Sequence, residues 1–130
     1  MKTQILVIDD DSKNIFALCA VLQSRGFKCV TATSAKEGIE TLKNNREIGI
    51  VLMDMMMPEM DGYEAINTIK AMKELSHIPI IAVTAQAMAG DRQKCLSAGA
   101  ADYLSKPVDV DLLLSSINQY LGNEFTDSSR

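Results

Sequence analysis

The sequence predicts an α/β fold built on a doubly wound parallel sheet of five strands, with five helices. Short apolar runs alternate with segments of helical periodicity along the chain, which is typical of strand–helix–strand units. Three runs are continuously apolar, whereas one alternates with polar residues and one is short, so three strands are expected inside the sheet and two at its edges. No linker-like segment interrupts the pattern before residue 122. We therefore predict one domain over residues 1–122, followed by a polar tail or linker stub at 123–130.

The apolar pattern of each expected strand predicts its position in the sheet. They lie at 4–8, 28–33, 48–53, 78–83 and 101–104. The second alternates and the fifth is short, so both are assigned to edges. Because strand–helix–strand crossovers are right-handed, the chain leads outward from the first strand to the second and returns to place the third on the other side. The resulting order is 2-1-3-4-5, and it reverses between strands one and three, where open α/β sheets hold their sites.

The first two helices are marked by periodicity and capping. In the first, apolar residues recur at helical spacing up to a stop at Gly26: Ile15, Leu18, Cys19 and Leu22. The second opens at Ser34, whose hydroxyl can accept from the Glu37 amide while Glu37 reaches back to the start of the helix.

The other three helices have similar signals. The third follows Asp61-Gly62, the fourth runs from about Ala87 to Ala98 before Gly99, and the fifth begins after Asp109 and ends at Gly122. The inward residues are expected to be Ile66, Ile69 and Met72 or Lys73 in the third helix, and Leu113, Ile117, Tyr120 and Leu121 in the fifth.

Composition restricts the possible functions. The chain has 130 residues, 47% hydrophobic and 23% charged, which suits one globular domain that needs neither disulfide nor structural metal. A net charge of −4 without a basic stripe argues against nucleic-acid or membrane-surface binding. No apolar run is long enough to span a membrane and no signal peptide opens the chain, so a cytoplasmic location is expected. Cys19, Cys29 and Cys95 lack metal or redox spacing and are expected to be buried, reduced thiols.

Side chains that can carry chemistry follow four of the predicted strands. The first is followed by Asp9, Asp10 and Asp11, the third by Asp54, the fourth by Thr84 and the fifth by Lys106-Pro107. Because the carboxyl ends of parallel strands meet at one edge of a sheet, these groups are expected to converge.

Converging carboxylates need a compensating charge. A like-charged pair 4 Å apart costs about 4 kcal/mol at an effective dielectric of 20. Mg²⁺, which takes one or two carboxylates and keeps waters for a phosphate, fits this set better than Ca²⁺ or Zn²⁺. A carboxylate in this place can also act as a nucleophile and form an aspartyl phosphate, with Lys106 and Thr84 on the phosphoryl oxygens. The set therefore predicts a Mg²⁺-assisted phosphoryl acceptor.

Four motifs, in order and at compatible intervals, resemble the receiver domains of two-component response regulators, which have a flavodoxin-like fold. The resemblance covers residues 4 to about 121. It rests on Asp9-Asp10, Asp54 with Met57-Pro58, Met60 and Asp61-Gly62, Thr84-Ala85, and Lys106-Pro107. The resemblance implies that Asp54 accepts a phosphoryl group from a phosphohistidine of a histidine kinase or histidine phosphotransfer protein. It also implies that Mg²⁺ is bound by Asp9, Asp10, Asp54 and the backbone carbonyl of Met56. Lys106 and Thr84 are expected to contact the phosphoryl group, and the Lys106-Pro107 peptide bond is expected to be cis.

The resemblance further implies a phosphorylation-dependent switch. Tyr103 matches the aromatic position that moves inward when Thr84 shifts toward the phosphoryl group. The surface of helix four, strand five and helix five is then expected to change, to be read by a downstream protein, a fused domain or a second copy of the chain. Segments 85–91 and 98–103 are similar to receivers of hybrid sensor kinases, which implies a place in a phosphorelay. No enzymatic activity is expected beyond self-phosphorylation from a phosphodonor and autodephosphorylation.

Three alternatives remain. A haloacid-dehalogenase-like phosphatase also uses an aspartate nucleophile and Mg²⁺, but it needs a second acid where this chain has Met56. A flavin-binding module has a similar sheet but needs a phosphate loop after the first strand, where the aspartates would repel phosphate. A receiver-like binding module that works without phosphorylation is disfavoured by the intact acceptor residues.

Several residues have a structural interpretation instead. Asp11 and Asp61 are expected to cap helices rather than join the acidic cluster. His77 is expected in a loop at the opposite edge of the sheet. The methionines near Asp54 are expected in the core or in a loop rather than in a copper site: Met53, Met55, Met56, Met57 and Met60.

Overall fold

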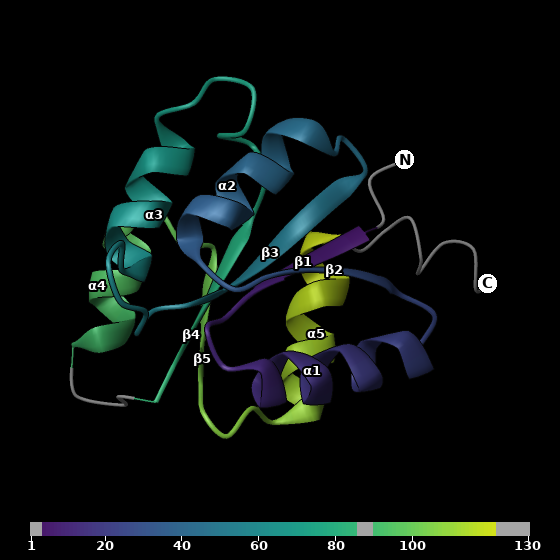
Figure 1. Ribbon diagram of the computed structural model, residues 1–130. Coiled ribbons are helices and arrows are strands. Elements are labelled where there is room, and N and C mark those ends of the chain that lie inside the picture. The colour runs from purple at the N-terminus through teal and green to yellow at the C-terminus, as the bar shows by residue number, and fades with distance from the viewer. Residues whose placement is uncertain (1–3, 86–89, 122–130) are drawn as a thin grey trace.

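A parallel sheet flanked by helices on both faces forms the centre of the molecule (Figure 1). The computed structural model describes residues 4–85 and 90–121. Its strands are β1 (Gln4–Ile8), β2 (Lys28–Ala32), β3 (Ile48–Asp54), β4 (Ile80–Thr84) and β5 (Asp102–Ser105). Its helices are α1 (Ser12–Ser24), α2 (Ala35–Asn44), α3 (Gly62–Lys70), α4 (Asp91–Ala98) and α5 (Val110–Tyr120). The strands are parallel in the order β2-β1-β3-β4-β5, so the predicted fold and strand order are confirmed.

Alternation along the strands divides the core in two. In register, Ile5 of β1 lies beside Cys29 of β2 and Ile50 of β3, and these side chains face α1 and α5. Leu6 and Val51 face the opposite side, toward α2, α3 and α4. Figure 1 shows these two groups of helices on either side of the sheet. Each central strand therefore buries both of its faces, which explains why its sequence is continuously apolar.

The edge strands are less buried than the central ones, as the alternation of the second strand and the shortness of the fifth predicted. β3 and β4 are buried throughout, whereas β2 and β5 each contain exposed and partly exposed residues. The prediction of buried thiols is confirmed for Cys19 and Cys95 but is wrong for Cys29, which is only partly buried because it lies on an edge strand.

Side-chain oxygens cap the helices where predicted. Asp11 accepts from the Lys13 amide at 2.9 Å at the start of α1, and Asp61 accepts from the Glu64 amide at 3.0 Å at the start of α3. The Ser34 hydroxyl accepts from the Glu37 amide at 3.1 Å, as expected. Glu37 differs in one detail from a standard capping box, because its Oε1 accepts from the amide of Thr33, one residue before the cap.

The boundaries of four strands differ from the prediction. β2 ends at Ala32 rather than at 33, β3 extends to Asp54, and β5 is shifted by one residue, to Asp102–Ser105. β4 begins at Ile80 rather than at 78, because Pro79 has no amide to donate and the Ile78 carbonyl accepts from Lys70 Nζ. α3 ends at Lys70, so Met72 packs on the core from the following turn while Lys73 stays exposed. The inward residues of α5 are Leu113, Ser116 and Ile117, with Tyr120 and Leu121 partly buried.

Some predictions fall on residues outside those described. These are the expected start of helix four at Ala87, the expected end of helix five at Gly122 and the tail at 123–130. α4 does end before Gly99, whose φ of +119° is the left-handed conformation that favours glycine. Within the described residues, every helix is too short or too polar to cross a membrane.

Candidate functional site

Three carboxylates meet at the carboxyl ends of β1 and β3. One oxygen from each of Asp9, Asp10 and Asp54 lies within 4.8 Å of the others. Asp9 and Asp54 are 2% and 3% exposed, whereas Asp10 is exposed to solvent. The cluster forms because β1 and β3 are neighbours in the sheet and both chains leave it at the same edge.

Backbone amides orient the two buried carboxylates. Asp9 Oδ1 accepts from the Asp11 amide at 2.8 Å, and Asp54 Oδ1 accepts from the Met56 amide at 3.0 Å. Each carboxylate thus closes a short turn that directs the chain out of the sheet. Asp11 itself caps α1 and is not part of the cluster.

Lys106 follows the edge strand β5 and brings a positive charge to the cluster. Its Nζ lies 3.2 Å from Asp9 Oδ2 and 3.5 Å from Asp54 Oδ1. The Lys106 amide donates to the Thr84 carbonyl at 2.8 Å, which fixes the end of β5 against the end of β4. The Lys106-Pro107 peptide is cis, as the family resemblance implied.

Among the described residues, the cluster holds more carboxylates than ammonium groups. Burial raises the pKa of Asp54 above its ordinary value, and the charge of Asp9 adds to this effect. The Met56 amide and the Lys106 ammonium act in the opposite direction but leave a net rise. Two buried carboxylates and one exposed carboxylate beside a single ammonium are the hard oxygen donor set that a divalent cation such as Mg²⁺ prefers.

Thr84 and Tyr103 lie on the same face of the sheet. Thr84, 4% exposed, ends β4. Tyr103 of β5 is in register with Ala82, two residues before Thr84, and is partly buried against the core beneath α2, α3 and α4. Burial raises the pKa of Tyr103, and the nearby Asp91 and Cys95 of α4 add to the rise.

The nearby methionines and His77 contribute no side chain to the cluster. The Met56 side chain is 51% exposed, so the backbone of this residue rather than its side chain faces the aspartate. Of the remaining nearby methionines, Met53, Met55 and Met57 are buried and Met60 is partly buried. His77 is exposed in the turn before β4, at the opposite edge of the sheet.

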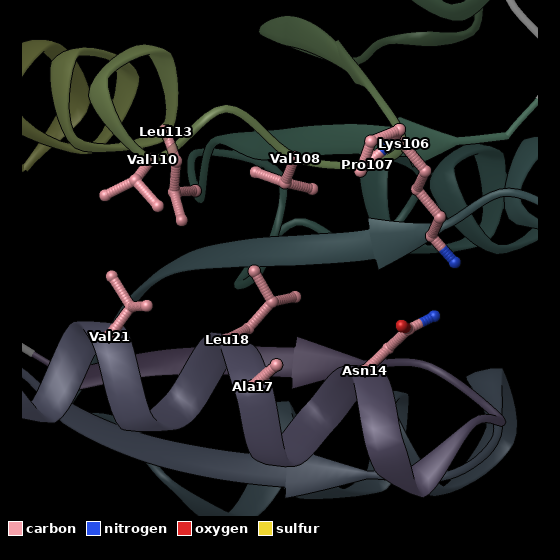
Figure 2. Close-up of a pocket in the computed structure, with 9 residues that line it drawn as sticks. All are labelled: Asn14, Ala17, Leu18, Val21, Lys106, Pro107, Val108, Val110 and Leu113. Carbon is pink, nitrogen blue, oxygen red and sulfur yellow. The ribbon is translucent and has the colours of Figure 1, made fainter.

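A groove that the sequence did not reveal adjoins the cluster. It lies between α1 and the segment that runs from Lys106 into α5, with a volume of about 280 Å³. Figure 2 shows Asn14 and Lys106 at one end of this groove and apolar side chains along the rest of it. The apolar lining is Ala17, Leu18, Val21, Pro107, Val108, Val110 and Leu113. Helical periodicity predicts α1, but it does not predict that Asn14 lines a groove. The groove depends on the position of α1 relative to α5 and the segment before it.

Comparison with known proteins decides the family. Residues 5–118 match the family model of the response regulator receiver domain. The chain belongs to this family. It is a receiver domain of two-component signalling systems, and the comparisons give no support to the phosphatase alternative.

Similar receiver domains cover nearly the whole chain. The polar-differentiation response regulator DivK of Brucella ovis is 31% identical over 123 residues, which are 95% of this chain and 99% of the relative. A receiver protein from Pseudomonas putida is 32% identical with a TM-score of 0.85, over 92% of this chain and 98% of that one. The receiver domain of a sensor histidine kinase from Pseudomonas aeruginosa PAO1 is 32% identical with a TM-score of 0.84, over 95% and 100% of the two chains. That structure has a magnesium ion coordinated in the active-site cleft.

Proposed function

We propose that this receiver domain accepts a phosphoryl group on Asp54 from a phosphohistidine of a histidine kinase or histidine phosphotransfer protein. The observation that carries the proposal is the position of Lys106 Nζ, 3.2 Å from Asp9 and 3.5 Å from Asp54. A cation held between two buried carboxylates is placed to pair with the oxygens of a phosphoryl group that arrives on Asp54. In this proposal the domain accepts the phosphoryl group and later loses it by hydrolysis, and it has no further enzymatic activity.

Asp54 is the nucleophile in this proposal. A carboxylate oxygen of Asp54 attacks phosphorus, and the bond from phosphorus to the imidazole nitrogen breaks with its electron pair leaving on the imidazole, which takes a proton. Lys106 pairs with the phosphoryl oxygens, and the Thr84 hydroxyl donates a hydrogen bond to one of them. The Met56 amide holds the Asp54 carboxylate in place for the attack, because it donates to Oδ1 at 3.0 Å.

Asp9, Asp10 and Asp54, with the backbone carbonyl of Met56, would hold Mg²⁺. When bound, the ion supplies positive charge to the carboxylates and to the phosphoryl oxygens. The exposure of Asp10 suits an ion that keeps several of its waters, since one side of the cluster is open to solvent.

The groove beside Lys106 supports docking of the phosphohistidine partner. A donor that delivers its phosphoryl group to Asp54 must cover the surface next to Lys106, and this surface is the polar end of the groove between α1 and α5. Its apolar remainder suits an apolar helix face of the donor, and Asn14 lies with Lys106 at the polar end of the groove.

Phosphorylation is then transmitted through Thr84 and Tyr103. Because the two residues share one face of neighbouring strands, a shift of Thr84 toward the phosphoryl group opens space on the side of Tyr103. Asp102, next to Tyr103, accepts from Ser116 Oγ of α5 at 2.5 Å and lies 3.7 Å from Arg92 Nη1 of α4. Movement of β5 is therefore coupled to both helices of the α4–β5–α5 surface, which would be read by a downstream protein, a fused domain or a second copy.

Phosphorylation from a small donor tests the acceptor. The intact mass of the protein is measured after incubation with acetyl phosphate, with Mg²⁺ or with chelator. With Mg²⁺ present, one phosphoryl group is expected on wild type and on Asp61→Asn, and none on Asp54→Asn. With chelator, none of the three proteins is expected to carry a phosphoryl group. Asp61 is the matched control because its carboxylate caps α3 outside the cluster. An adduct that persists on Asp54→Asn would contradict the assignment. If no adduct accumulates on wild type, binding of beryllofluoride is measured. A receiver that hydrolyses its phosphoryl group rapidly still binds beryllofluoride, whereas a module that works without phosphorylation does not.

The switch is tested separately by backbone amide spectra with and without beryllofluoride. We expect changes at Tyr103 and over α4, β5 and α5. Changes confined to the acidic cluster would retain the acceptor chemistry and reject the switch.

A further inference from the structure

Two of the three cysteines lie together, on the side of the sheet away from Tyr103. Cys19 is a buried residue of α1. Cys29 of β2 is in register with Ile5 and packs, as Ile5 does, in the core beneath α1 and α5. Both thiols therefore lie between α1 and the edge of the sheet, whereas Cys95 lies in the core on the opposite face.

The two cysteines are neighbours in the core. Both belong to the cluster beneath α1 and α5, and both line one cavity between α1 and β2. Burial raises the pKa of Cys29 to about 12, and the neighbouring Cys19 adds to this rise.

Solvent reaches this pair through a groove. A cavity of about 490 Å³ opens along the edge strand, and both cysteines line it together with Ser12, Ile15, Phe16, Ala20, Gln23 and Thr31. Phe16 is 77% exposed at its rim. Since β2 is an edge strand, no further strand of the described sheet covers this side, and a small reagent has a path to the sulfurs.

We propose that Cys19 and Cys29 form a modification site, a dithiol that a low-molecular-weight disulfide oxidises to an internal disulfide linking α1 to β2. One cysteine, as its thiolate, attacks a sulfur of the oxidant, and the other half of the oxidant leaves as a thiolate that takes a proton. The second cysteine thiolate attacks the mixed disulfide at the protein sulfur and releases the remaining half. The two protein thiols lose two electrons and two protons, and the oxidant becomes two thiols.

The surroundings of the pair determine how it reacts. Little Cys29 is ionised at neutral pH, so oxidation is slow there and accelerates with pH, by about tenfold per pH unit below the thiol pKa. The buried site does not stabilise a thiolate, which is the form that reduction of the disulfide would release. The disulfide, once formed, is therefore expected to resist reduction.

The test uses the full chain and oxidised glutathione at pH 7 and pH 9, followed by alkylation and non-reducing peptide mapping by mass spectrometry. We expect a Cys19–Cys29 disulfide in wild type and in the matched control Cys95→Ser, formed faster at pH 9. Cys19→Ser and Cys29→Ser are expected to show at most a glutathione adduct. The disulfide should raise the melting temperature of wild type by several degrees, since it shortens the free loop of the unfolded chain.

Three results would overturn the proposal in protein that circular dichroism shows to be folded. They are a disulfide that includes Cys95, glutathione retained on Cys29 while Cys19 stays free, and two thiols that remain reduced at both pH values. Where a serine variant does not fold, the alanine variant at the same position replaces it. The outcome does not depend on whether Asp54 accepts a phosphoryl group.

Discussion

Lys106 Nζ lies 3.2 Å from Asp9 Oδ2 and joins residues that are 97 positions apart in the chain. The Asp9 side chain is 3% exposed and that of Lys106 is 21% exposed, so this is a largely buried ion pair. Removing one partner of such a pair leaves a buried charge without compensation, which costs more than the pair itself contributes.

Lys106→Met is therefore expected to destabilise the protein. In chelator, loss of the ammonium should lower the free energy of unfolding by about 1–3 kcal/mol, because Asp9 and Asp54 then face each other without a cation. Urea denaturation measures the effect. The control is Lys43→Met, since Lys43 pairs with Glu40 at 3.5 Å on the surface, where such a pair contributes at most about 0.5 kcal/mol. Equal effects of the two substitutions would show that the ion pair of the cluster contributes no more than a surface pair.

Asp54→Asn is expected to stabilise the protein when no divalent cation is bound. Because the pKa of Asp54 is raised in the folded chain, the native state holds this proton more tightly than the unfolded state does. The corresponding stability is present below the ordinary pKa of 3.8 and is lost as the pH rises through the raised pKa. Melting temperatures of both proteins in chelator, measured from pH 4 to pH 8, should diverge with rising pH in favour of the variant. Mg²⁺ should then raise the melting temperature of wild type more than that of the variant. Superimposable curves in all conditions would exclude both effects.

Lys70→Met tests a lysine in a structural role. Lys70 Nζ donates to the carbonyls of Ser76 and Ile78, each at 3.0 Å, and so closes the turn before β4. Burial lowers the pKa of Lys70, but the two carbonyls lose their donor when the ammonium is removed. We expect a loss of about 1–3 kcal/mol from unsatisfied carbonyls, measured by urea denaturation. Lys73→Met, at an exposed position three residues later, should have little effect. A stabilised Lys70→Met protein would mean that burial of the charge outweighs its hydrogen bonds.

Gly62→Ala is expected to disrupt the loop that follows Asp54. A Cβ at Gly62 would lie 2.4 Å from Met55 Sδ and 2.7 Å from Met55 Cα, so the backbone itself must move. Gly90→Ala is the contrasting substitution, because its φ is +92° but, among the described residues beyond its chain neighbours, no atom lies within 4 Å of the added Cβ. Gly90→Ala should cost about 1–2 kcal/mol from backbone strain alone, and Gly62→Ala clearly more. Thermal melting of the two variants ranks them, and the reverse order would be inconsistent with the packing of Gly62 against Met55.

Sequence pattern was sufficient for the architecture and for the convergence of the acids. Continuous and alternating apolar runs separate central from edge strands, and the handedness of crossovers then orders them, so Asp9, Asp54 and Lys106 could be brought to one edge without coordinates. The capping roles of Asp11 and Asp61 could be predicted in the same way, because a cap depends on residues within one turn.

Features that depend on two elements packing together could not be predicted. Lys70 on the last turn of a helix has the sequence signature of a solvated lysine, and only the position of the turn before β4 gives it two acceptors. The neighbouring positions of Cys19 and Cys29 depend on the packing of α1 against β2, which apolar neighbours in the sequence do not specify. The bridge from Asp102 to Ser116 and Arg92 likewise spans three elements.

The long separation between Asp9 and Lys106 also bears on synthesis of the protein. A ribosome releases the aspartates early and the lysine near the end of the domain, so a growing chain holds its acids without their counter-charge until β5 has emerged and docked beside β4. In the proposed function, a nascent chain therefore lacks the cation that pairs with the phosphoryl oxygens, however much of its sheet has formed. Phosphoryl acceptance at Asp54 is then expected to begin only after Lys106 has docked beside Thr84.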